Sequence, residues 1–322
     1  MKEFLLPLII CPEHIATQTP LHFHESDVCY SGDDIWTGNL ICPQCQAIYS
    51  IRDGVADLAP VATPRPAVQG KYELDSTVGA YLWSQFGDLY TEDTAILNEL
   101  VKPSDAYASW ANLFSFGEGP FLDVGCAVGR LVLEAAGRGL LAVGVDLSHA
   151  FISAARSLVR TGRIDTLLTV EGQITQPFSF ALPKRLRNET VEFIVGDALA
   201  LPFRSDCFAS LASLNILDKV PFPLRHLEEL SRVGHQHGCE LVVSDPYSWS
   251  SDVAAPSDWL GGTLEGPYAG RGIDNVRALL AGRDGHINPP YTTDSCPDIP
   301  WTIRNHTHHA EYIVSRPLYA TR

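Results

Sequence analysis

The chain has 322 residues, enough for two domains or for one large domain with an appendage. Hydrophobic residues make up 45% and charged residues 19%, which is typical of a soluble globular protein, and no apolar run approaches the ~20 residues that span a bilayer. The formal net charge of −15 argues against a phosphate-binding groove as the main binding surface. We therefore expect a small-molecule substrate, with neither a nucleic acid nor a membrane as partner.

The N-terminal stretch MKEFLLPLII imitates a secretion signal. Its apolar run is short, Pro7 interrupts it, and no small-residue cleavage site follows. We interpret residues 1–10 as a strand that leads into a metal-binding knuckle. The protein is accordingly expected in the cytoplasm.

Two short knuckles in the first 58 residues carry metal-ligand residue types, Cys11-x-x-His14 and Cys42-x-x-Cys45. Together they can supply four ligands to one tetrahedral zinc ion, and such a closed site is structural rather than catalytic. The second knuckle lies between strand-like segments and predicts the turn of a β-hairpin. Free thiols or a degenerate site remain alternatives, as do three substitutes for His14, namely His22, His24 and Cys29.

The segment begins with LLPLIICP and ends with ICPQCQAIYSIRDGVADL. It resembles the small zinc-ribbon proteins that activate RNA and protein methyltransferases, and the zinc ribbons fused in front of some bacterial methyltransferases. The resemblance implies a small β-rich zinc ribbon over residues 1–58 that holds a structural Zn²⁺. The segment departs from that group at His14, where the first knuckle would end in Cys.

The next part of the chain connects this unit to a larger one. Residues 59–70 are rich in Pro and Ala and predict an extended linker. Residues 71–117 have helical apolar spacing, and 81–90 and 94–101 predict helices that form a cap across the entrance of the following domain. The aromatic residues of this cap are more typical of a core than of a binding site, so we expect only one or two, Tyr81 among them, to contact a ligand.

The larger unit, residues 118–322, opens with FLDVGCAVGR at 121–130, which predicts a buried strand, a tight turn and the start of a helix. Gly125 and Gly129 lack the Cβ that would keep a ligand away from the backbone. Taken alone, this turn is also typical of an ordinary strand-to-helix connection. The residues that follow it are therefore needed to assign a function.

Strands and helices alternate up to about residue 250, which predicts an α/β fold with a mostly parallel, doubly wound sheet. The predicted strands end at Asp146, at Asp197 and near Asn215, which brings polar side chains to one sheet edge beside the glycine turn. Residues 161–190 are longer than a simple crossover and predict an inserted hairpin.

The polar strand ends indicate the kind of cofactor. A carboxylate at Asp146 can accept hydrogen bonds from both ribose hydroxyls of an adenosine cofactor. Cys126 and Ala127 replace the glycines that a pyrophosphate requires, and no Gly-Lys-Ser/Thr phosphate loop is present. The pattern therefore favours an adenosine cofactor without phosphates.

This domain resembles the seven-stranded S-adenosylmethionine-dependent methyltransferases. The resemblance implies a Rossmann-like sheet with an antiparallel C-terminal strand and S-adenosylmethionine as cofactor. It places expected cofactor contacts at Asp123, Gly125, Cys126, Gly129, Asp146, Asp197, Ala198 and Asn215. We also expect contacts from Tyr81 of the cap and from Leu147, which follows Asp146.

Several segments narrow the resemblance: LNILDKV, SDPYSW, WLGG and PWTIRNHTHHAEY. Over roughly residues 118–320 they resemble the methyltransferase domain of ovothiol synthases and its stand-alone relatives, a family that methylates an imidazole nitrogen of mercaptohistidine. The zinc ribbon and linker depart from those fused enzymes. Residues 251–322 would add a C-terminal lid and two final strands over 300–307 and 310–319.

Methyl transfer requires the acceptor nitrogen to be held in line with the sulfonium methyl group. A neutral imidazole needs no strong base. We therefore expect Asn215 and Asp218 to orient the ring by hydrogen bonds, with Tyr247 as a further residue that orients it. Trp259 would contact the substrate, and Arg304 would bind its carboxylate.

Three alternative functions remain open. The zinc ribbon suggests an RNA methyltransferase, and the methylation of another small molecule is a further alternative. A non-catalytic cofactor-binding scaffold that recruits a partner is the non-enzymatic alternative. The oligomeric state also stays open, with a homodimer among the options.

Overall fold

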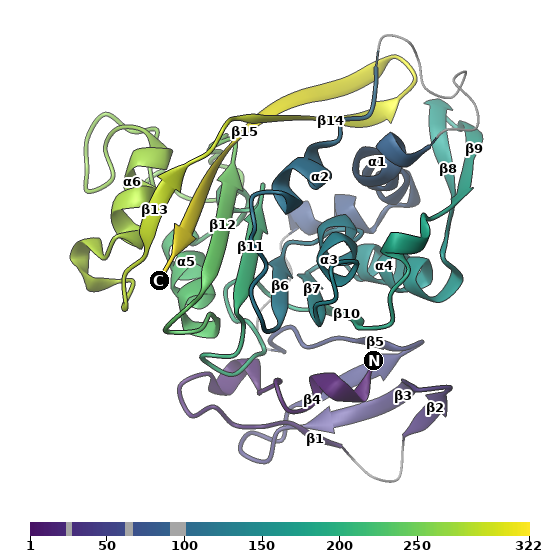
Figure 1. The fold of residues 1–322 in the computed structure, drawn as a ribbon, viewed down its shortest axis with the longest axis horizontal. Helices are drawn as coiled ribbons and strands as arrows, with labels where there is room; N and C mark the ends of the chain where they lie inside the picture. Colours follow the sequence, from purple (N-terminus) through teal and green to yellow (C-terminus); the bar gives the residue numbers. More distant parts are fainter. Residues whose placement is uncertain (24–27, 62–66, 91–100) are drawn as a thin grey trace.

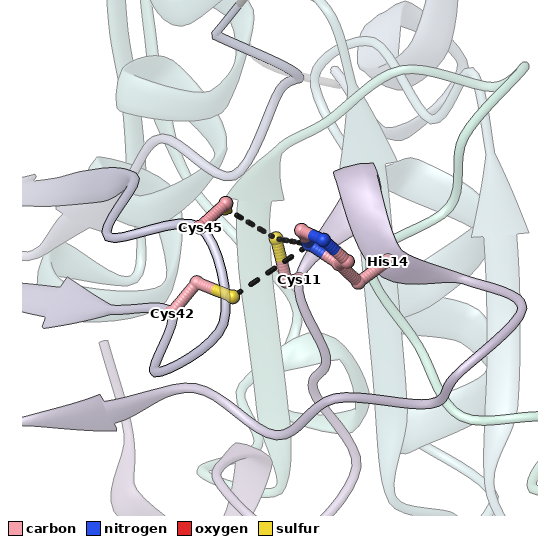
Figure 2. Close-up of side chains that lie close together, drawn as sticks. All are labelled: Cys11, His14, Cys42 and Cys45. Carbon is pink, nitrogen blue, oxygen red and sulfur yellow. Dashed lines mark hydrogen bonds between the residues drawn. The ribbon is translucent and has the colours of Figure 1, made fainter.

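The computed structural model describes residues 1–23, 28–61, 67–90 and 101–322 (Figure 1). The N-terminal unit is an antiparallel sheet in the order β1 (His22–Phe23), β3 (Asp34–Ile41), β4 (Ile48–Arg52) and β5 (Val55–Ala56), with β2 (Cys29–Ser31) also paired to β3. The turn between β3 and β4 carries Cys42 and Cys45 toward Cys11 and His14, which confirms the predicted hairpin (Figure 2).

The first ten residues do not form the expected strand. They contain a 3₁₀ helix, η1 (Glu3–Leu5), and a turn, while Lys2, Ile9 and Ile10 make only isolated bridges. Pro7 has no N–H to contribute to a strand ladder, which explains why the apolar run packs as a turn instead. A second 3₁₀ helix, η2 (Pro12–His14), follows the first knuckle residue.

The central sheet has the order β10-β7-β6-β11-β12-β15-β13, with β14 paired to β15. Five strands run parallel, and β15 pairs antiparallel with β12, β13 and β14. The predicted α/β class with a mostly parallel sheet is thereby confirmed. The strands are β6 (Phe121–Val124), β7 (Ala142–Asp146), β10 (Val191–Val195), β11 (Ser210–Leu214), β12 (Glu240–Asp245), β13 (Thr292–Ser295), β14 (Ile299–His306) and β15 (His309–Thr321).

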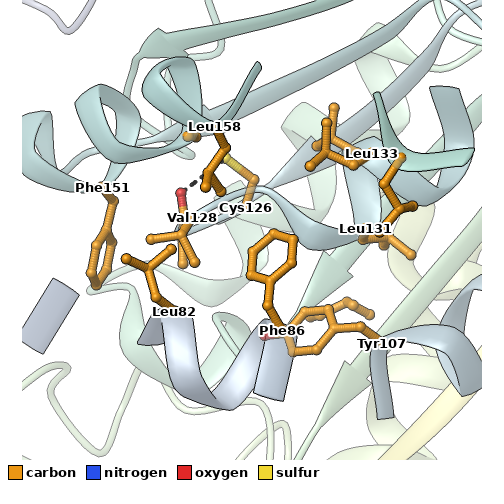
Figure 3. Packing of buried hydrophobic residues seen from close by; sticks show 14 of the residues in the cluster. Leu82, Phe86, Tyr107, Cys126, Val128, Leu131, Leu133, Phe151 and Leu158 are labelled. Atoms are coloured by element: carbon orange, nitrogen blue, oxygen red, sulfur yellow. Dashed lines mark hydrogen bonds between the residues drawn. The ribbon is translucent and has the colours of Figure 1, made fainter. Parts of the chain in front are cut away.

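Helices cover both faces of this sheet, and the ribbon shares one face with two of them. One apolar core joins the sheet to α1 (Asp75–Phe86), α2 (Ala106–Ala111), α3 (Arg130–Ala136) and α4 (His149–Thr161), as the close-up in Figure 3 illustrates. The second core joins the other face to α5 (Pro223–Val233), α6 (Gly272–Leu280) and the N-terminal ribbon. Successive β6 residues point into different cores, with Phe121 in the first and Leu122 in the second, as strand alternation requires.

The ribbon also extends the edge of the central sheet. Asp57 bridges Val195 in parallel orientation, and the Leu58 N–H donates to the Val195 carbonyl at 2.8 Å. Arg156 forms ion pairs with Asp34 and Glu192, which join the ribbon, α4 and β10. The ribbon is therefore built into the same packed unit, and the predicted domain boundaries at 58, 70 and 117 stay predictions.

The remaining predictions concern the inserted hairpin, the C-terminal strands and two helices. The inserted hairpin is confirmed as β8 (Arg163–Glu171) and β9 (Ile174–Ala181), and the two final strands as β14 and β15, whose hairpin reaches across the top in Figure 1. The sequence did not predict α6, which lies between two loop-like segments. The predicted helix over 94–101 falls almost wholly outside the described residues, as does part of the linker.

Short 3₁₀ helices complete the fold at η4 (Ala67–Glu73), η5 (Gly87–Leu89), η6 (Lys184–Leu186), η7 (Leu217–Lys219) and η8 (Arg283–Gly285). Across the described ranges, no helix combines the length and apolar character needed to cross a membrane.

Candidate active site

A cavity of about 710 Å³ opens at the carboxyl ends of the parallel strands. The chain runs from β6 through β7 to β10 on one side and then crosses to β11 and β12 on the other. This change of direction creates the crevice in which open α/β sheets bind ligands. Seven of the expected cofactor contacts line the cavity, namely Tyr81, Gly125, Asp146, Leu147, Asp197, Ala198 and Asn215.

The glycine turn after β6 has two different requirements. Gly125 has φ of +79° and lines the cavity, and a Cβ there would lie 2.5 Å from the Ile216 side chain. Gly129 has φ of +87° and precedes α3, where a Cβ would lie 2.4 Å from Phe193. Packing therefore requires glycine at both positions, and of the two only Gly125 also presents backbone to the cavity.

Asp146 is positioned by the backbone of two turns. Its Oδ2 accepts a hydrogen bond from the Ala127 N–H at 3.0 Å, and its Oδ1 accepts from the Ser148 N–H at 2.9 Å. Burial is the largest influence and raises the pKa of Asp146 to about 6, against the effect of these hydrogen bonds. Each carboxylate oxygen keeps acceptor capacity for a ribose hydroxyl, so the site fits an adenosine group.

Asp123 and Cys126 lie behind the cavity wall rather than in it. Both are buried, and Asp123 Oδ1 has no hydrogen-bond partner among the described residues. Burial, followed by the nearby charge of Asp146, raises the pKa of Asp123 to about 8. Asp123, Cys126 and Gly129 were predicted to contact the cofactor directly, but none of the three lines the cavity.

The segment after β10 forms another wall and is held by α5. Asp197 Oδ1 accepts from the Leu199 N–H at 2.8 Å, and burial raises the pKa of Asp197. His226 lies 3.2 Å through Nδ1 from the Ala198 carbonyl and 2.8 Å through Nε2 from Ser213 Oγ. Because burial lowers the pKa of His226 to about 4, its imidazole is neutral and can donate to one partner while it accepts from the other. The sequence reasoning missed this support.

Aromatic residues from distant segments enclose the cavity. Tyr81 and Phe151 have ring centroids 4.7 Å apart, and Tyr72 lies 6.3 Å from Tyr81 in an edge-on arrangement. Tyr107 and Trp301 also line the cavity, as do Tyr49 and Phe222. Only Tyr81 was predicted, because nothing in the local sequence indicates that α2, β14 and the 71–73 segment meet at this cavity.

Asn215 follows β11 and lines the cavity. It adopts φ of +60°, a conformation in which Asn is enriched, and its Oδ1 accepts a hydrogen bond from Ser315 Oγ on β15. This contact fixes the amide orientation. The amide NH₂ and the second lone pair of Oδ1 remain for a ligand.

Asp218 is buried below this wall and does not line the cavity. Its Oδ2 accepts from the Ser248 N–H at 2.6 Å, its own N–H donates to Asp245 Oδ2 at 3.3 Å, and its Oδ1 pairs with Lys219 Nζ at 2.8 Å. The side chain therefore ties together the segments after β11 and β12. Lys219, which the sequence reasoning did not select, does line the cavity.

Tyr247, Trp259 and Arg304 also lie outside the cavity lining. The Tyr247 ring packs against Gly272, and its hydroxyl is buried without a partner in the described part of the chain. Trp259 Nε1 donates to the Ala254 carbonyl at 3.0 Å, and Arg304 is buried on β14 with Nη2 donating to Thr307 Oγ1 at 3.0 Å. Their predicted substrate contacts would need another cavity or a rearrangement.

The four predicted metal ligands converge in the ribbon (Figure 2). Ligand atoms of Cys11, His14, Cys42 and Cys45 all lie within 4.8 Å of one another. Among the described residues, no other group of three or more potential ligands meets the same criterion, so His22 and Cys29 do not replace His14, while His24 lies outside the described residues. Three thiolates and one imidazole match a closed tetrahedral zinc site.

Around these ligands, the fold supplies a second layer of contacts. Tyr49 on β4 is buried with its hydroxyl 3.3 Å from Cys11 Sγ. The Cys42 N–H donates to the Ala47 carbonyl at 3.0 Å, which closes the turn. These contacts orient first-layer ligands, as hydrogen bonds around structural metals do.

Comparison with known families supplies the class of enzyme. Residues 122–241 match the family model described as a methyltransferase domain, and residues 2–54 match that of Trm112p-like proteins. The chain carries a methyltransferase domain. The predicted enzyme class is confirmed, and the match supports S-adenosylmethionine as cofactor. The match of the N-terminal segment to Trm112p-like proteins agrees with its Cys₃His cluster.

Solved structures with a related arrangement share little sequence. A protein from work on the conversion of a disulfide bond into a thioacetal group in echinomycin biosynthesis is 19% identical, with TM-score 0.43, over 68% of this chain and 81% of its own. Haemonchus contortus phosphoethanolamine N-methyltransferase 2, in complex with S-adenosyl-L-methionine, is 16% identical, with TM-score 0.41, over 62% and 39%. A chain from the complex of the Haloferax volcanii Trm112 methyltransferase activator with a methyltransferase is 19% identical, with TM-score 0.35, over 57% and 62%.

A search of curated proteins found no match to the chain. The narrower resemblance to ovothiol synthases is not shown by these comparisons, and it stays a prediction.

Proposed function

We propose that the enzyme transfers a methyl group from S-adenosylmethionine to an imidazole nitrogen of a small thiolated histidine, of the mercaptohistidine type. The observation that carries this proposal is the position of Asn215, whose fixed amide lines the cavity on the side opposite Asp197 and next to the glycine turn. The sequence segments that resemble the ovothiol family include this residue.

The donor half would be held by groups already oriented in the fold. Asp146 would accept from the ribose hydroxyls, Gly125 would allow close approach of the backbone, and Ala198 would contact the adenine. When bound, S-adenosylmethionine supplies an electrophilic methyl group. The aromatic walls would exclude water from the acceptor nitrogen, so that less solvent must reorganise during transfer.

The acceptor ring would be oriented by Asn215. Its amide oxygen can accept from the N–H of a neutral imidazole, and its NH₂ can donate to the ring sulfur. That arrangement selects the tautomer whose other nitrogen carries the lone pair. The bound donor would supply the methyl group and leave as S-adenosylhomocysteine, while the ring N–H held by Asn215 would lose its proton to water.

Cavity size and charge also support a small acceptor. A volume of about 710 Å³ lies within the ~300–1,000 Å³ of small-molecule sites. The net charge of −15 is unfavourable for binding a polyphosphate surface.

The decisive assay uses labelled methyl donor with three acceptors: mercaptohistidine, histidine and bulk tRNA. We expect label in mercaptohistidine, reduced about tenfold or more in Asn215→Ala. Label in tRNA alone would contradict the proposal.

The ribbon favours one second candidate, methylation of RNA. Residues 2–54 match Trm112p-like proteins, and Ile48, Tyr49 and Ser50 of the ribbon line the same cavity. Binding to tRNA that weakens steeply with added salt, together with methyl transfer to it, would support this candidate.

A further inference from the structure

Two of the charged side chains that line the cavity are not used by the proposed adenosine site or by the ribbon side of the cavity. Six of the described lining residues carry charge: Asp57, Lys71, Asp146, Asp197, Lys219 and Asp252. Asp146 and Asp197 belong to the proposed adenosine site. Asp57 lies where the ribbon joins β10, and Lys71 Nζ lies 4.8 Å from the centre of the Tyr72 ring. Lys219 and Asp252 remain, one of each sign.

These two residues come from neighbouring parts of the sheet. Lys219 follows β11, and Asp252 lies on the segment after β12. The two strands are adjacent and parallel, with Leu214 opposite Ser244, so their carboxyl ends meet at the same edge. The Ser248 N–H donates to Asp218 Oδ2 at 2.6 Å and holds the two segments together. Both charges therefore lie on the side of the cavity that carries Asn215.

Lys219 is partly held in place but keeps binding capacity. Its Nζ lies 2.8 Å from Asp218 Oδ1, while its own side chain is 43% exposed and that of Asp218 is fully buried. An ammonium group has three donors, so one contact to Asp218 leaves donors for a second carboxylate. The backbone N–H of the exposed Asp252 donates to Ser250 Oγ at 3.2 Å, which anchors the residue through its main chain.

We propose that Lys219 and Asp252 form a subsite for a zwitterionic α-amino acid, in which Lys219 binds the α-carboxylate and Asp252 the α-ammonium group. This subsite rests on the proposed function, since it recognises the part of the acceptor that is not methylated. It also replaces Arg304 as the carboxylate partner, because Arg304 is buried on β14 and does not line the cavity. Opposite charges at this wall would select amino acids over amines and carboxylic acids of similar size.

The test measures steady-state constants for mercaptohistidine and for its decarboxylated analogue in the full chain. In Lys219→Met we expect the KM for mercaptohistidine to rise ~10-fold or more, as for a lost charge-assisted hydrogen bond. The KM for the decarboxylated analogue should stay within twofold of wild type. Asp252→Asn should raise the KM for mercaptohistidine but leave the KM for its N-acetyl derivative unchanged. Binding of S-adenosylhomocysteine should be unchanged in both variants.

Matched controls are Lys184→Met and Asp165→Asn, which remove exposed charges outside the cavity lining. Equal losses for mercaptohistidine and the decarboxylated analogue in Lys219→Met would overturn the subsite. Transfer to a different amino acid, weakened in Lys219→Met, would contradict the thiolated-histidine proposal and support the subsite. Transfer only to molecules without an α-amino acid group would overturn the subsite and leave the methyltransferase class intact.

Discussion

The donor side and the acceptor side of the cavity are built differently. The donor side uses backbone groups and half-buried carboxylates, such as the Gly125 turn and Asp146, held by hydrogen bonds from the main chain. The acceptor side uses side chains on the segments after β11 and β12, among them Asn215 and the partly exposed Lys219. If the proposed roles hold, donor binding follows from the fold, whereas the choice of acceptor depends on a few side chains.

The largest expected effect concerns the ribbon, which joins the donor side at β10. Replacing Cys42 and Cys45 by Ser in one variant should reduce bound zinc from about one ion per chain to none. Structural zinc contributes on the order of 10 kcal/mol to folding of small metal-binding units, so the ribbon should lose its protection from hydrogen exchange. Elemental analysis and hydrogen exchange measure the two effects.

Cys29→Ser is the matched control, because Cys29 is an exposed ribbon cysteine outside the cluster. Unchanged zinc in the double variant would refute the ligand set. If the double variant loses zinc and β10 also loses its protection from hydrogen exchange, the ribbon and the donor side unfold together as one unit.

The next effect tests how firmly α5 holds the donor side. Burial lowers the pKa of His226 to about 4, below its usual value of 6.5, so the unfolded chain binds the extra proton first as pH falls. Wild-type stability should therefore fall between pH 6.5 and pH 4, by at most about 3 kcal/mol from this group. The contribution is fully present above pH 6.5.

Urea unfolding at several pH values measures this loss, and His226→Phe should lack it. The exposed His237→Phe is the control and should keep the wild-type pH dependence. If His226→Phe lost as much unfolding free energy between pH 6.5 and pH 4 as wild type, other groups would be the cause.

Asp146→Ala removes a direct donor-side contact. We expect S-adenosylhomocysteine to bind ~10- to 100-fold more weakly, since hydrogen bonds to a charged group contribute about 1.5–3 kcal/mol. Isothermal titration measures the change, with Asp165→Ala on the exposed face of β8 as control. Wild-type affinity in Asp146→Ala would remove this carboxylate from the donor site.

Asn215→Ala tests the acceptor side and should have the smallest effect on the donor. We expect kcat/KM for the acceptor to fall about tenfold, while affinity for S-adenosylhomocysteine changes less than twofold. Ser315→Ala should produce a smaller loss, because it frees the Asn215 amide without removing it. A loss of donor affinity as large as the loss in kcat/KM would place Asn215 on the donor side instead.

The same contrast explains what the sequence could predict. Periodicity and strand-end acids are local signals, so the sheet, Asp146, Asp197 and the Cys42–Cys45 hairpin were all found. Gly129 and Cys126 were assigned to the cofactor because their spacing does not reveal that Phe193 occupies the space beside Gly129. Trp301 and Tyr107 are far from the motif in sequence, and only the folded sheet brings them to the cavity.

Several residues predicted for the acceptor lie outside the cavity lining for a related reason. Asp218 has the residue type of a catalytic acid or base, yet its contacts with Ser248 and Lys219 give it a supporting position. Arg304 was chosen for its charge, but its strand register buries it on β14. Residue type near a strand end therefore does not distinguish a lining side chain from the one beneath it.

The central claim is that one cavity divides into a donor side and an acceptor side with separate determinants. Its most direct test is the dissociation constant of S-adenosylhomocysteine measured in parallel for wild type, Asp146→Ala and Lys219→Met. We predict measurable binding to wild type, a loss of at least tenfold in Asp146→Ala, and no change in Lys219→Met. Equal losses in the two variants, or no binding to wild type, would contradict the division.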